Sequence, residues 1–400
     1  MKKAKNLLLI SIGVIFIGMI ILYSCRSYTG PVKKVDGDKL DNNLDSGSEE
    51  EDYFDTINNC IIPALTVTKN NTLIAAIGDK NNAGKILIKT SKDGGTNWSA
   101  YNGSIKNDDI ATGFAHPFFI NCYDGSILLG IATTNETENI VSFYRSTTEG
   151  TSWNKESAKI EMHQNATSEL DKPLTSQHAF ATYGNGLALR HNGNTNTLLF
   201  PYYYTDKTGS GVISTMISTN DGKHWEPYGN DEGPYASYGA KFIELNDGNI
   251  LYFMSDNFKK VGWFESKDCG KTSKCITLFN VGAHNEDRIE YADFARYEFD
   301  GRDIKGAEYA LMVFSTDKTS YSVKMTTDDF NKGQKNKSGT YLGGGSKVIA
   351  ANLTKPSAIY PTITVLKDGT IATLAAEDDG MVFRRFELNW FLEDELWMEQ

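Results

Sequence analysis

Hydrophobic and polar positions alternate in short runs along most of the chain, and glycine, aspartate and asparagine gather in the turns between the runs. Alternation of period two over four to eight residues predicts a strand with one buried face. The runs come in pairs, each made of an apolar strand, a turn and a second alternating strand. The six predicted pairs are 72–77 with 85–90, 126–132 with 140–145, 197–203 with 211–217, 248–254 with 261–265, 308–314 with 321–325, and 370–375 with 381–387. We therefore expect an all-β fold.

An eight-residue motif follows four of these pairs. Complete copies are Ser91–Trp98, Ser146–Trp153 and Ser218–Trp225, whereas Ser266–Ser273 lacks the tryptophan and 326–329 keeps only a trace. In each copy a serine and, two positions later, an aspartate, asparagine or threonine can hydrogen-bond the backbone of a tight turn, and a glycine can adopt positive φ. We therefore expect a hairpin turn at each copy and assign these residues a structural role.

The strand pairs recur at intervals of roughly 55 to 60 residues, which is typical of repeated four-stranded units. Six units of this size account for residues 56–400. A ring of four-stranded blades leaves only short sheet edges at its rim, so it limits the exposure of unpaired strands. The sequence therefore predicts a six-bladed β-propeller over 56–400.

The amino terminus has the pattern of an export signal. Three lysines within the first five residues precede an uncharged apolar run over 7–23, which is followed by Ser24 and Cys25. A basic segment, an apolar segment and a small residue before the cut describe a signal peptide, here 1–24. Cysteine directly after the small residue resembles a bacterial lipobox, so we expect Cys25 to carry lipid. The alternative is an uncleaved membrane anchor, and either one tethers an exported domain to a membrane.

The stretch 25–55 is acidic and contains few apolar residues. Because like charges repel and extend a chain, we interpret it as a flexible tether that holds the propeller off the membrane. An acidic metal-binding tail is the alternative.

Charge and composition narrow the function further. The chain has 51 acidic and 40 basic side chains, a net charge of -11, and only 8 arginines among the basic residues. Nothing supplies the basic face that nucleic acid needs, so we exclude nucleic acid as a partner. The six histidines are scattered without a metal-binding motif, and we expect no metal and no other cofactor. Gly343–Lys347 lacks full phosphate-loop spacing and is interpreted as a turn.

Four cysteines remain beyond the predicted lipid site, and their spacing fits no zinc motif. In an exported protein, a disulfide between Cys269 and Cys275 that closes a short loop is a reasonable expectation.

The eight-residue motifs resemble the Asp-boxes of the sialidase, or neuraminidase, superfamily, and four further segments strengthen the resemblance. Ile62–Leu65 is similar to that family's opening Arg-Ile-Pro strand, and Ile243–Gly248 to the start of its fourth blade. Tyr360–Ile371 resembles the strand that bears its nucleophile, and Val382–Phe386 its closing strand. The resemblance covers nearly the whole of 56–400. It implies a six-bladed propeller with a glycan site at its centre.

The resemblance also implies a defined chemistry. Sialic acid carries a carboxylate on its anomeric carbon, which calls for arginines whose planar fork pairs with it bidentately. A carboxylate nucleophile would be repelled there, and the family uses a tyrosine activated by a glutamate. An aspartate serves as general acid and base.

When the family's catalytic positions are matched to this sequence one residue at a time, only some of the catalytic residues are present. Tyr360 matches the nucleophile, and Glu377 lies within one residue of the position that supports the first arginine. Asp79 is the nearest acid in the shortened loop that carries the acid/base aspartate, and Lys80 follows it as a candidate substrate-binding residue. The opening arginine itself is replaced by Ile61.

The remaining positions depart from the family. His116 stands where an aspartate precedes a proline in the second blade. The second and third arginines fall near Lys260 and Lys318, with Ser255 as another match for the second. The position of the glutamate that pairs with the tyrosine falls near Gly239, and Glu244 is close to it in sequence.

Three functional hypotheses follow. The first is a membrane-anchored, exported sialidase-like propeller with a degenerate catalytic set that binds sialylated or other surface glycans near Tyr360. The second is an active, retaining exo-α-sialidase that uses Tyr360 as nucleophile and lysines in place of arginines. The third is an interaction protein whose central channel is filled by side chains.

Overall fold

The computed structural model describes residues 38–39, 62–79, 82–107, 115–133, 141–161, 179–181, 185–190, 196–205, 211–229, 240–245, 247–255, 260–280, 291–298, 310–317, 320–326, 346–350, 360–377 and 380–387. The predicted signal peptide and Cys25 lie outside these ranges. Within them, no helix has the length and apolar character needed to cross a membrane. The chain divides into two compact units, 1–34 and 35–400.

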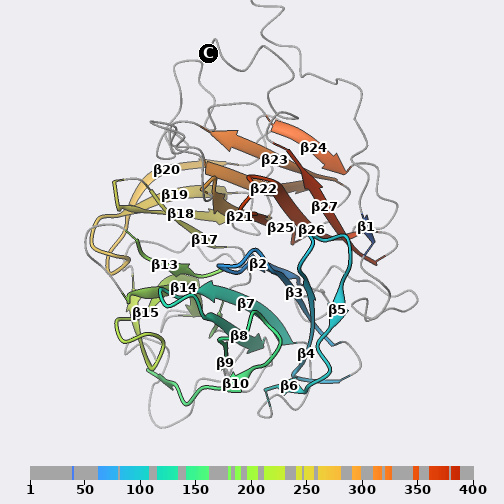
Figure 1. The fold of residues 1–400 in the computed structure, drawn as a ribbon. Coiled ribbons are helices and arrows are strands. Elements are labelled where there is room, and N and C mark those ends of the chain that lie inside the picture. The colour runs from blue at the N-terminus through green and yellow to red at the C-terminus, as the bar shows by residue number, and fades with distance from the viewer. Residues whose placement is uncertain are drawn as a thin grey trace, which may run out of the picture. The chain divides into compact units, whose positions relative to one another are not determined.

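The described strands form six sheets, which we number as blades in chain order (Figure 1). Blade 1 contains β2 (Ala64–Val67), β3 (Leu73–Gly78), β4 (Lys85–Ser91), β5 (Ser99–Ala100) and β6 (Ile105–Lys106). Blade 2 contains β7 (Ala115–Asn121), β8 (Ile127–Thr133), β9 (Ser142–Ser146) and β10 (Asn154–Lys155). Blade 3 contains β12 (Ala179–Ala181), β13 (Leu187–Ala188), β14 (Leu198–Thr205), β15 (Gly211–Ser218), β16 (His224–Gly229) and, at its outer edge, β11 (Lys159–Ile160).

Blades 4 to 6 follow the same meander. Blade 4 contains β17 (Lys241–Glu244), β18 (Ile250–Ser255), β19 (Lys260–Ser266) and β20 (Lys274–Asn280). Blade 5 contains β21 (Tyr291–Arg296), β22 (Ala310–Asp317), β23 (Ser320–Thr326) and β24 (Ser346–Ala350). Blade 6 contains β25 (Thr362–Val365), β26 (Ile371–Glu377), β27 (Gly380–Phe386) and β1 (Asp38–Lys39). All six predicted strand pairs are confirmed to within three residues at each end.

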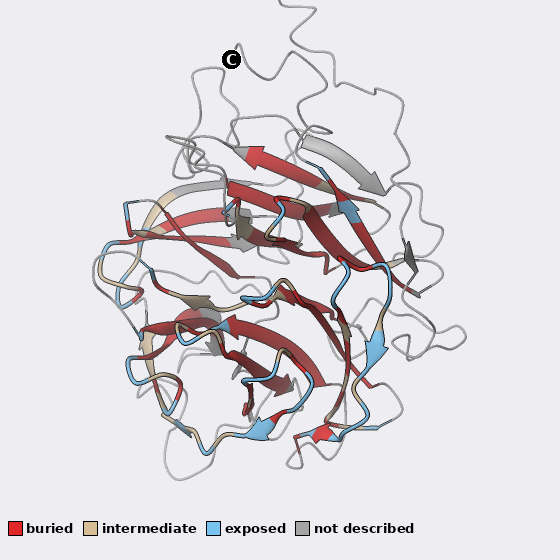
Figure 2. Cartoon of the chain, viewed as in Figure 1, coloured by how far each residue is buried: buried red, intermediate tan, exposed pale blue. Residues whose placement is uncertain are grey.

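Six apolar clusters join neighbouring blades into a closed ring, and buried residues follow the strands (Figure 2). From the junction of blades 1 and 2 round to that of blades 6 and 1, the residues that share a cluster include Ile74 and Leu129, Phe118 and Phe200, Leu199 and Phe242, Ile243 and Met312, Leu311 and Ile363, and Phe383 and Leu73. Both faces of a blade are therefore covered, and β3 is buried at all six of its positions.

The box turns have the structural role that the sequence predicts. In the second box the Gly150 amide donates to Ser146 Oγ at 2.9 Å, and the Ser152 amide donates to Thr148 Oγ1 at 2.9 Å. Glu149 and Gly150 have φ of 58° and 79°. Two successive left-handed residues recur in the other three described boxes. A glycine at the second position adopts this backbone without a Cβ penalty.

The start of the second unit closes the last blade. β1 pairs antiparallel with β27, with Asp38 opposite Phe383 and Lys39 opposite Val382. This strand lies within 25–55, where the sequence pattern indicates a tether and no strand. The pairing covers the outer edge of blade 6, so the two ends of the propeller are joined by hydrogen bonds within one sheet.

The expected disulfide is wrong. The structure contains no disulfide among its three described cysteines, Cys122, Cys269 and Cys275. Cys269 occupies the left-handed position before the glycine of the fourth box, with φ of 62°. Cys269 and Cys275 both pack against the apolar cluster between blades 3 and 4. These thiols act as small apolar side chains in this part of the fold.

Candidate functional site

Strand direction gives the ring two different ends. In blade 2, Ala115 at the start of β7 lies opposite Thr133 at the end of β8. The other end of β8, Ile127, lies opposite Ser146, which opens a box. The same register holds in the other antiparallel blades. The first strand of each four-strand meander is the inner strand, and its start therefore lies at the same end of the ring as the turn between the second and third strands. We call this end the N-terminal face and the opposite end the box face.

Five residues that sequence analysis assigned to the site lie at the N-terminal face. Tyr360 lies two residues before the start of β25, and His116 is the second residue of β7. Asp79 follows β3, Lys260 begins β19 and Glu377 ends β26. The fold thus brings together, at one end of the ring, positions spread over nearly 300 residues of sequence.

Several predicted side chains are outside the described structure. These are Lys80, Lys318 and the side chains of Lys260, Glu377 and Ser255, together with Ile61 and Gly239. Their assignments remain predictions.

Tyr360 is buried, with 3% of its surface exposed, and its ring lies against that of Tyr291. The ring centroids are 4.3 Å apart and the planes are tilted by 54°. Tyr291 begins β21 and is partly exposed, so the two rings come from adjacent blades at the same end of the ring. They form an aromatic pair at the N-terminal face.

Below this pair, three polar side chains from consecutive blades form a buried group, which we call the buried trio. Lys241 from β17, Asp293 from β21 and Thr362 from β25 are 1%, 2% and 1% exposed. Lys241 Nζ lies 3.7 Å from Asp293 Oδ1, and Thr362 Oγ1 donates to Asp293 Oδ2 at 2.6 Å. The Ile363 amide donates to the same carboxylate oxygen at 3.3 Å.

Burial controls the electrostatics of the trio. Loss of hydration lowers the pKa of Lys241 from 10.5 to about 8, and the carboxylate of Asp293 opposes this shift. The trio therefore holds a buried ammonium group that loses its proton more readily than an ordinary lysine does. Lysine side chains are usually exposed, so the residue type at position 241 gives no sign that the position is buried.

Asp79 is held by its own turn. Its carboxylate is 6% exposed, accepts a hydrogen bond from Asn82 Nδ2 at 2.8 Å, and lies 3.2 Å from Lys85 Nζ. His116, at the start of β7, is also buried, with 4% of its surface exposed. The acid and the imidazole are thus fixed in the walls of blades 1 and 2.

Glu244, the acid close in sequence to the position of the glutamate partner, does not lie at the same end of the ring as Tyr360. It ends β17 at the box face, whereas Tyr360 lies before the start of its inner strand. Its Oε2 accepts the Arg190 amide at 2.8 Å. Nearness in sequence to the start of a strand does not give the end of the ring at which a residue lies.

The five described arginines are committed to contacts within the fold. At the box face, Arg145 Nε lies 2.8 Å from Glu156 Oε1 and its Nη2 donates to the Asp221 carbonyl at 2.7 Å. In the same region, Glu298 forms ion pairs with Arg190 and Arg296.

The two arginines of the closing strand join blades. Arg385 Nη1 donates to the Gly94 carbonyl of the first box at 3.0 Å. Arg384 is buried, and its Nη1 donates to Tyr321 Oη at 3.0 Å between blades 5 and 6. The other three arginines lie outside the described residues.

Comparison with known proteins agrees with this architecture. A sialidase from Micromonospora viridifaciens is 24% identical over 367 residues, which cover 82% of this chain and 51% of that protein. The chain thus spans about half the length of this curated relative. No family model matches the chain.

Solved structures show the same fold at low identity. The leech intramolecular trans-sialidase in complex with 2,7-anhydro-Neu5Ac has a TM-score of 0.60 and 13% identity, covering 87% of this chain and 71% of that one. The intramolecular trans-sialidase from Ruminococcus gnavus in complex with oseltamivir carboxylate has a TM-score of 0.62 and 12% identity, covering 82% and 94%. The chain therefore has the six-bladed β-propeller fold of these solved sialidase structures.

Proposed function

We propose that this protein is an exported, lipid-anchored propeller that binds sialylated or other surface glycans at its N-terminal face and does not hydrolyse them. The proposal rests on the contacts that the described arginines make within the fold. All five make contacts within the fold, four of them at the box face, away from Tyr360. A sialidase needs guanidinium groups to hold the carboxylate of its substrate, because lysine cannot reproduce their bidentate pairing.

The N-terminal face offers groups that suit a sugar. Aromatic rings pack against the apolar face of a pyranose, and tyrosine also offers a hydroxyl for hydrogen bonding. Tyr291 and Tyr360 supply two such rings from adjacent blades. Lys80, Lys260 and Lys318 are predicted at the same end and would add positive charge for an acidic glycan.

A retaining exo-α-sialidase is the second candidate. It is favoured by the position of Tyr360 before β25, which fits the nucleophile of the resemblance, and by the curated sialidase relative. In this reaction the Tyr360 oxygen would attack the anomeric carbon and lose its hydroxyl proton to solvent, while Asp79 protonates the departing glycosidic oxygen. Water would then cleave the glycosyl-tyrosine bond, with Asp79 accepting the proton from that water and the released Tyr360 oxygen regaining a proton from solvent.

One pair of assays on the full-length protein separates the two candidates. We expect no release of the fluorophore from a fluorogenic sialoside above the blank without protein. On a glycan array, we expect saturable binding that Tyr360→Ala weakens at least tenfold, because the substitution removes one ring of the aromatic pair. Tyr101→Ala, which removes a partly buried tyrosine beside the outer strands of blade 1, is the matched control and should bind as the wild type does.

Hydrolysis by the wild type that is lost in Tyr360→Phe would overturn the binding proposal and favour the sialidase. Equal glycan binding by the wild type and Tyr360→Ala would place the ligand elsewhere. A thermal melt of each variant confirms that the compared proteins are folded.

A further inference from the structure

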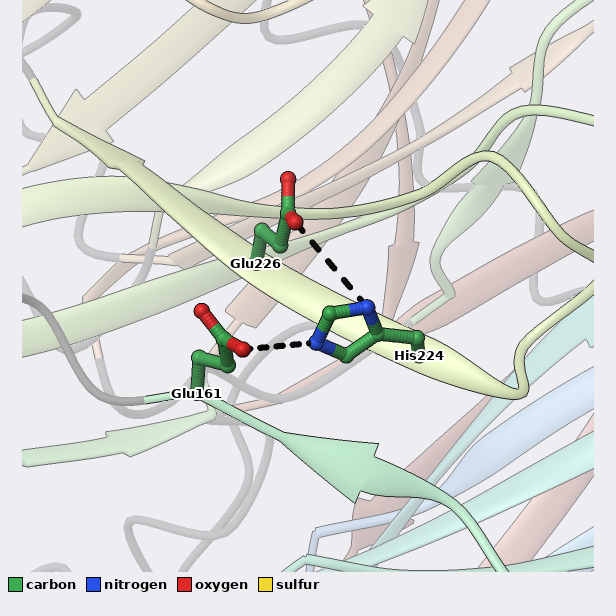
Figure 3. A group of neighbouring side chains, drawn as sticks. All are labelled: Glu161, His224 and Glu226. Atoms are coloured by element: carbon green, nitrogen blue, oxygen red, sulfur yellow. Dashed lines mark hydrogen bonds and ion pairs between the residues drawn. The ribbon is translucent and has the colours of Figure 1, made fainter.

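Three side chains meet at the outer edge of blade 3, far along the blade from its inner strands. Glu161, His224 and Glu226 each offer a ligand atom, and these atoms all lie within 4.8 Å of one another (Figure 3). His224 Nε2 is 2.9 Å from Glu161 Oε1, and its Nδ1 is 3.9 Å from Glu226 Oε1. The side chains are 31% to 46% exposed, so the group is open to solvent ions.

The backbone on both sides of the group is fixed. β11 runs parallel to β16, with Lys159 opposite His224 and Ile160 opposite Trp225. The Glu161 amide donates to the Trp225 carbonyl at 2.9 Å. Trp225 is fully buried and stacks on Phe143 at 5.2 Å, which anchors the strand between His224 and Glu226. The ligand atoms therefore project from two strands whose register is set.

The charge pattern of this group favours a cation. The register places Glu161 beside Glu226, and like charges across a strand pair are destabilising. Lys159 offsets part of the negative charge, with its Nζ 2.7 Å from Glu161 Oε1. Lys159 is 72% exposed, so its ammonium group can move away if another cation takes its place.

We propose that Glu161, His224 and Glu226 bind one first-row divalent metal ion, for which Zn²⁺ is the natural probe. An imidazole and two carboxylates are a ligand set that suits Zn²⁺ and its neighbours, whereas Ca²⁺ and Mg²⁺ prefer oxygen ligands alone. Bond lengths near 2 Å require donor atoms about 3 to 3.5 Å apart. Glu161 Oε1 and His224 Nε2, 2.9 Å apart, are already close to this spacing, and rotation of the half-exposed Glu226 side chain brings in the third ligand.

A neighbouring group holds the other oxygen of Glu226. Tyr228 Oη donates to Glu226 Oε2 at 3.0 Å, and Glu226 Oε1 lies on the Nδ1 side of the imidazole, so this carboxylate must rotate to join Glu161 at Nε2. Hydrogen bonds of this kind hold metal ligands in position. The ion would join β11, which follows the outer strand of blade 2, to the edge of blade 3. We therefore expect the ion to stabilise the junction of these blades without touching the N-terminal face.

The test is a Zn²⁺ titration of the untagged, full-length protein by calorimetry, after treatment with chelator, desalting and alkylation of accessible cysteines. We expect one saturable equivalent per chain. His224→Gln should weaken binding at least tenfold, because an amide is a far poorer ligand than imidazole. Lys159→Gln should tighten binding severalfold, since it removes the competing cation. Lys223→Gln removes an exposed lysine from the same turn and should leave the affinity unchanged.

A second readout is thermal stability. Zn²⁺ should raise the melting temperature of the wild type and leave that of His224→Gln unchanged, while both melt alike in chelator. The absence of a saturable equivalent in the wild type, or the same affinity in His224→Gln, would overturn the proposal. Glycan binding measured in chelator should be unaffected, so the outcome does not depend on the function of the N-terminal face.

Discussion

Replacing Asp293 by leucine is expected to lower the free energy of unfolding by about 3 to 5 kcal/mol, because it leaves a buried ammonium group without its counter-charge. Lys241 is 1% exposed, and Asp293 is the partner that stands 3.7 Å from its Nζ. The substitution also removes the acceptor for the Thr362 hydroxyl and the Ile363 amide. The loss is measured by urea unfolding of the full-length protein at pH 7.

The control is the double variant Lys241→Met/Asp293→Leu. Apolar residues of similar volume often replace a buried ion pair at little cost, so the double variant should recover most of the stability lost in the single one. Lys267→Ala breaks the exposed pair of Lys267 with Glu265 and should change stability by less than about 0.5 kcal/mol. A loss in Asp293→Leu no larger than that in Lys267→Ala would show that the pair is not a buried ion pair in solution.

The strands could be predicted because their signals are local. Alternation and turn residues both act over fewer than ten residues, and the box turns satisfy their hydrogen bonds within one motif. The two-residue strands β1 and β11 carry no periodic pattern. They form because a distant strand edge is open to them, at β27 and β16 respectively. No pattern within either segment contains that information.

The site could be predicted only in part, for a related reason. A lysine in a strand is normally expected at the surface, but an inner strand in a closed ring has no exposed face, and all four residues of β17 are buried. The buried trio joins residues from three blades, and the Glu161–His224 contact spans 63 residues of sequence. The resemblance to sialidases identified Tyr360, Asp79 and His116 as candidate site residues, because a family motif specifies single positions whereas periodicity specifies only strands.

The buried trio also predicts how stability depends on pH. The pKa of Lys241 is lowered from 10.5 to about 8 in the folded protein, mainly by desolvation. Between these two values the unfolded chain keeps a proton that the folded chain has lost. Stability rises with pH wherever the unfolded state binds more protons, so this group makes the free energy of unfolding increase through that window.

Below pH 8 the cost of burying the ammonium group is fully present, and above pH 10.5 it is gone. We therefore expect the wild type to gain roughly 3 kcal/mol relative to Lys241→Met/Asp293→Leu between pH 7.5 and 10.5. Urea unfolding of both proteins across this range measures the gain, and the difference between them cancels the titration of other lysines and tyrosines. A constant difference would mean that Lys241 keeps an ordinary pKa, and that water or a ligand reaches the ammonium group beneath the aromatic pair.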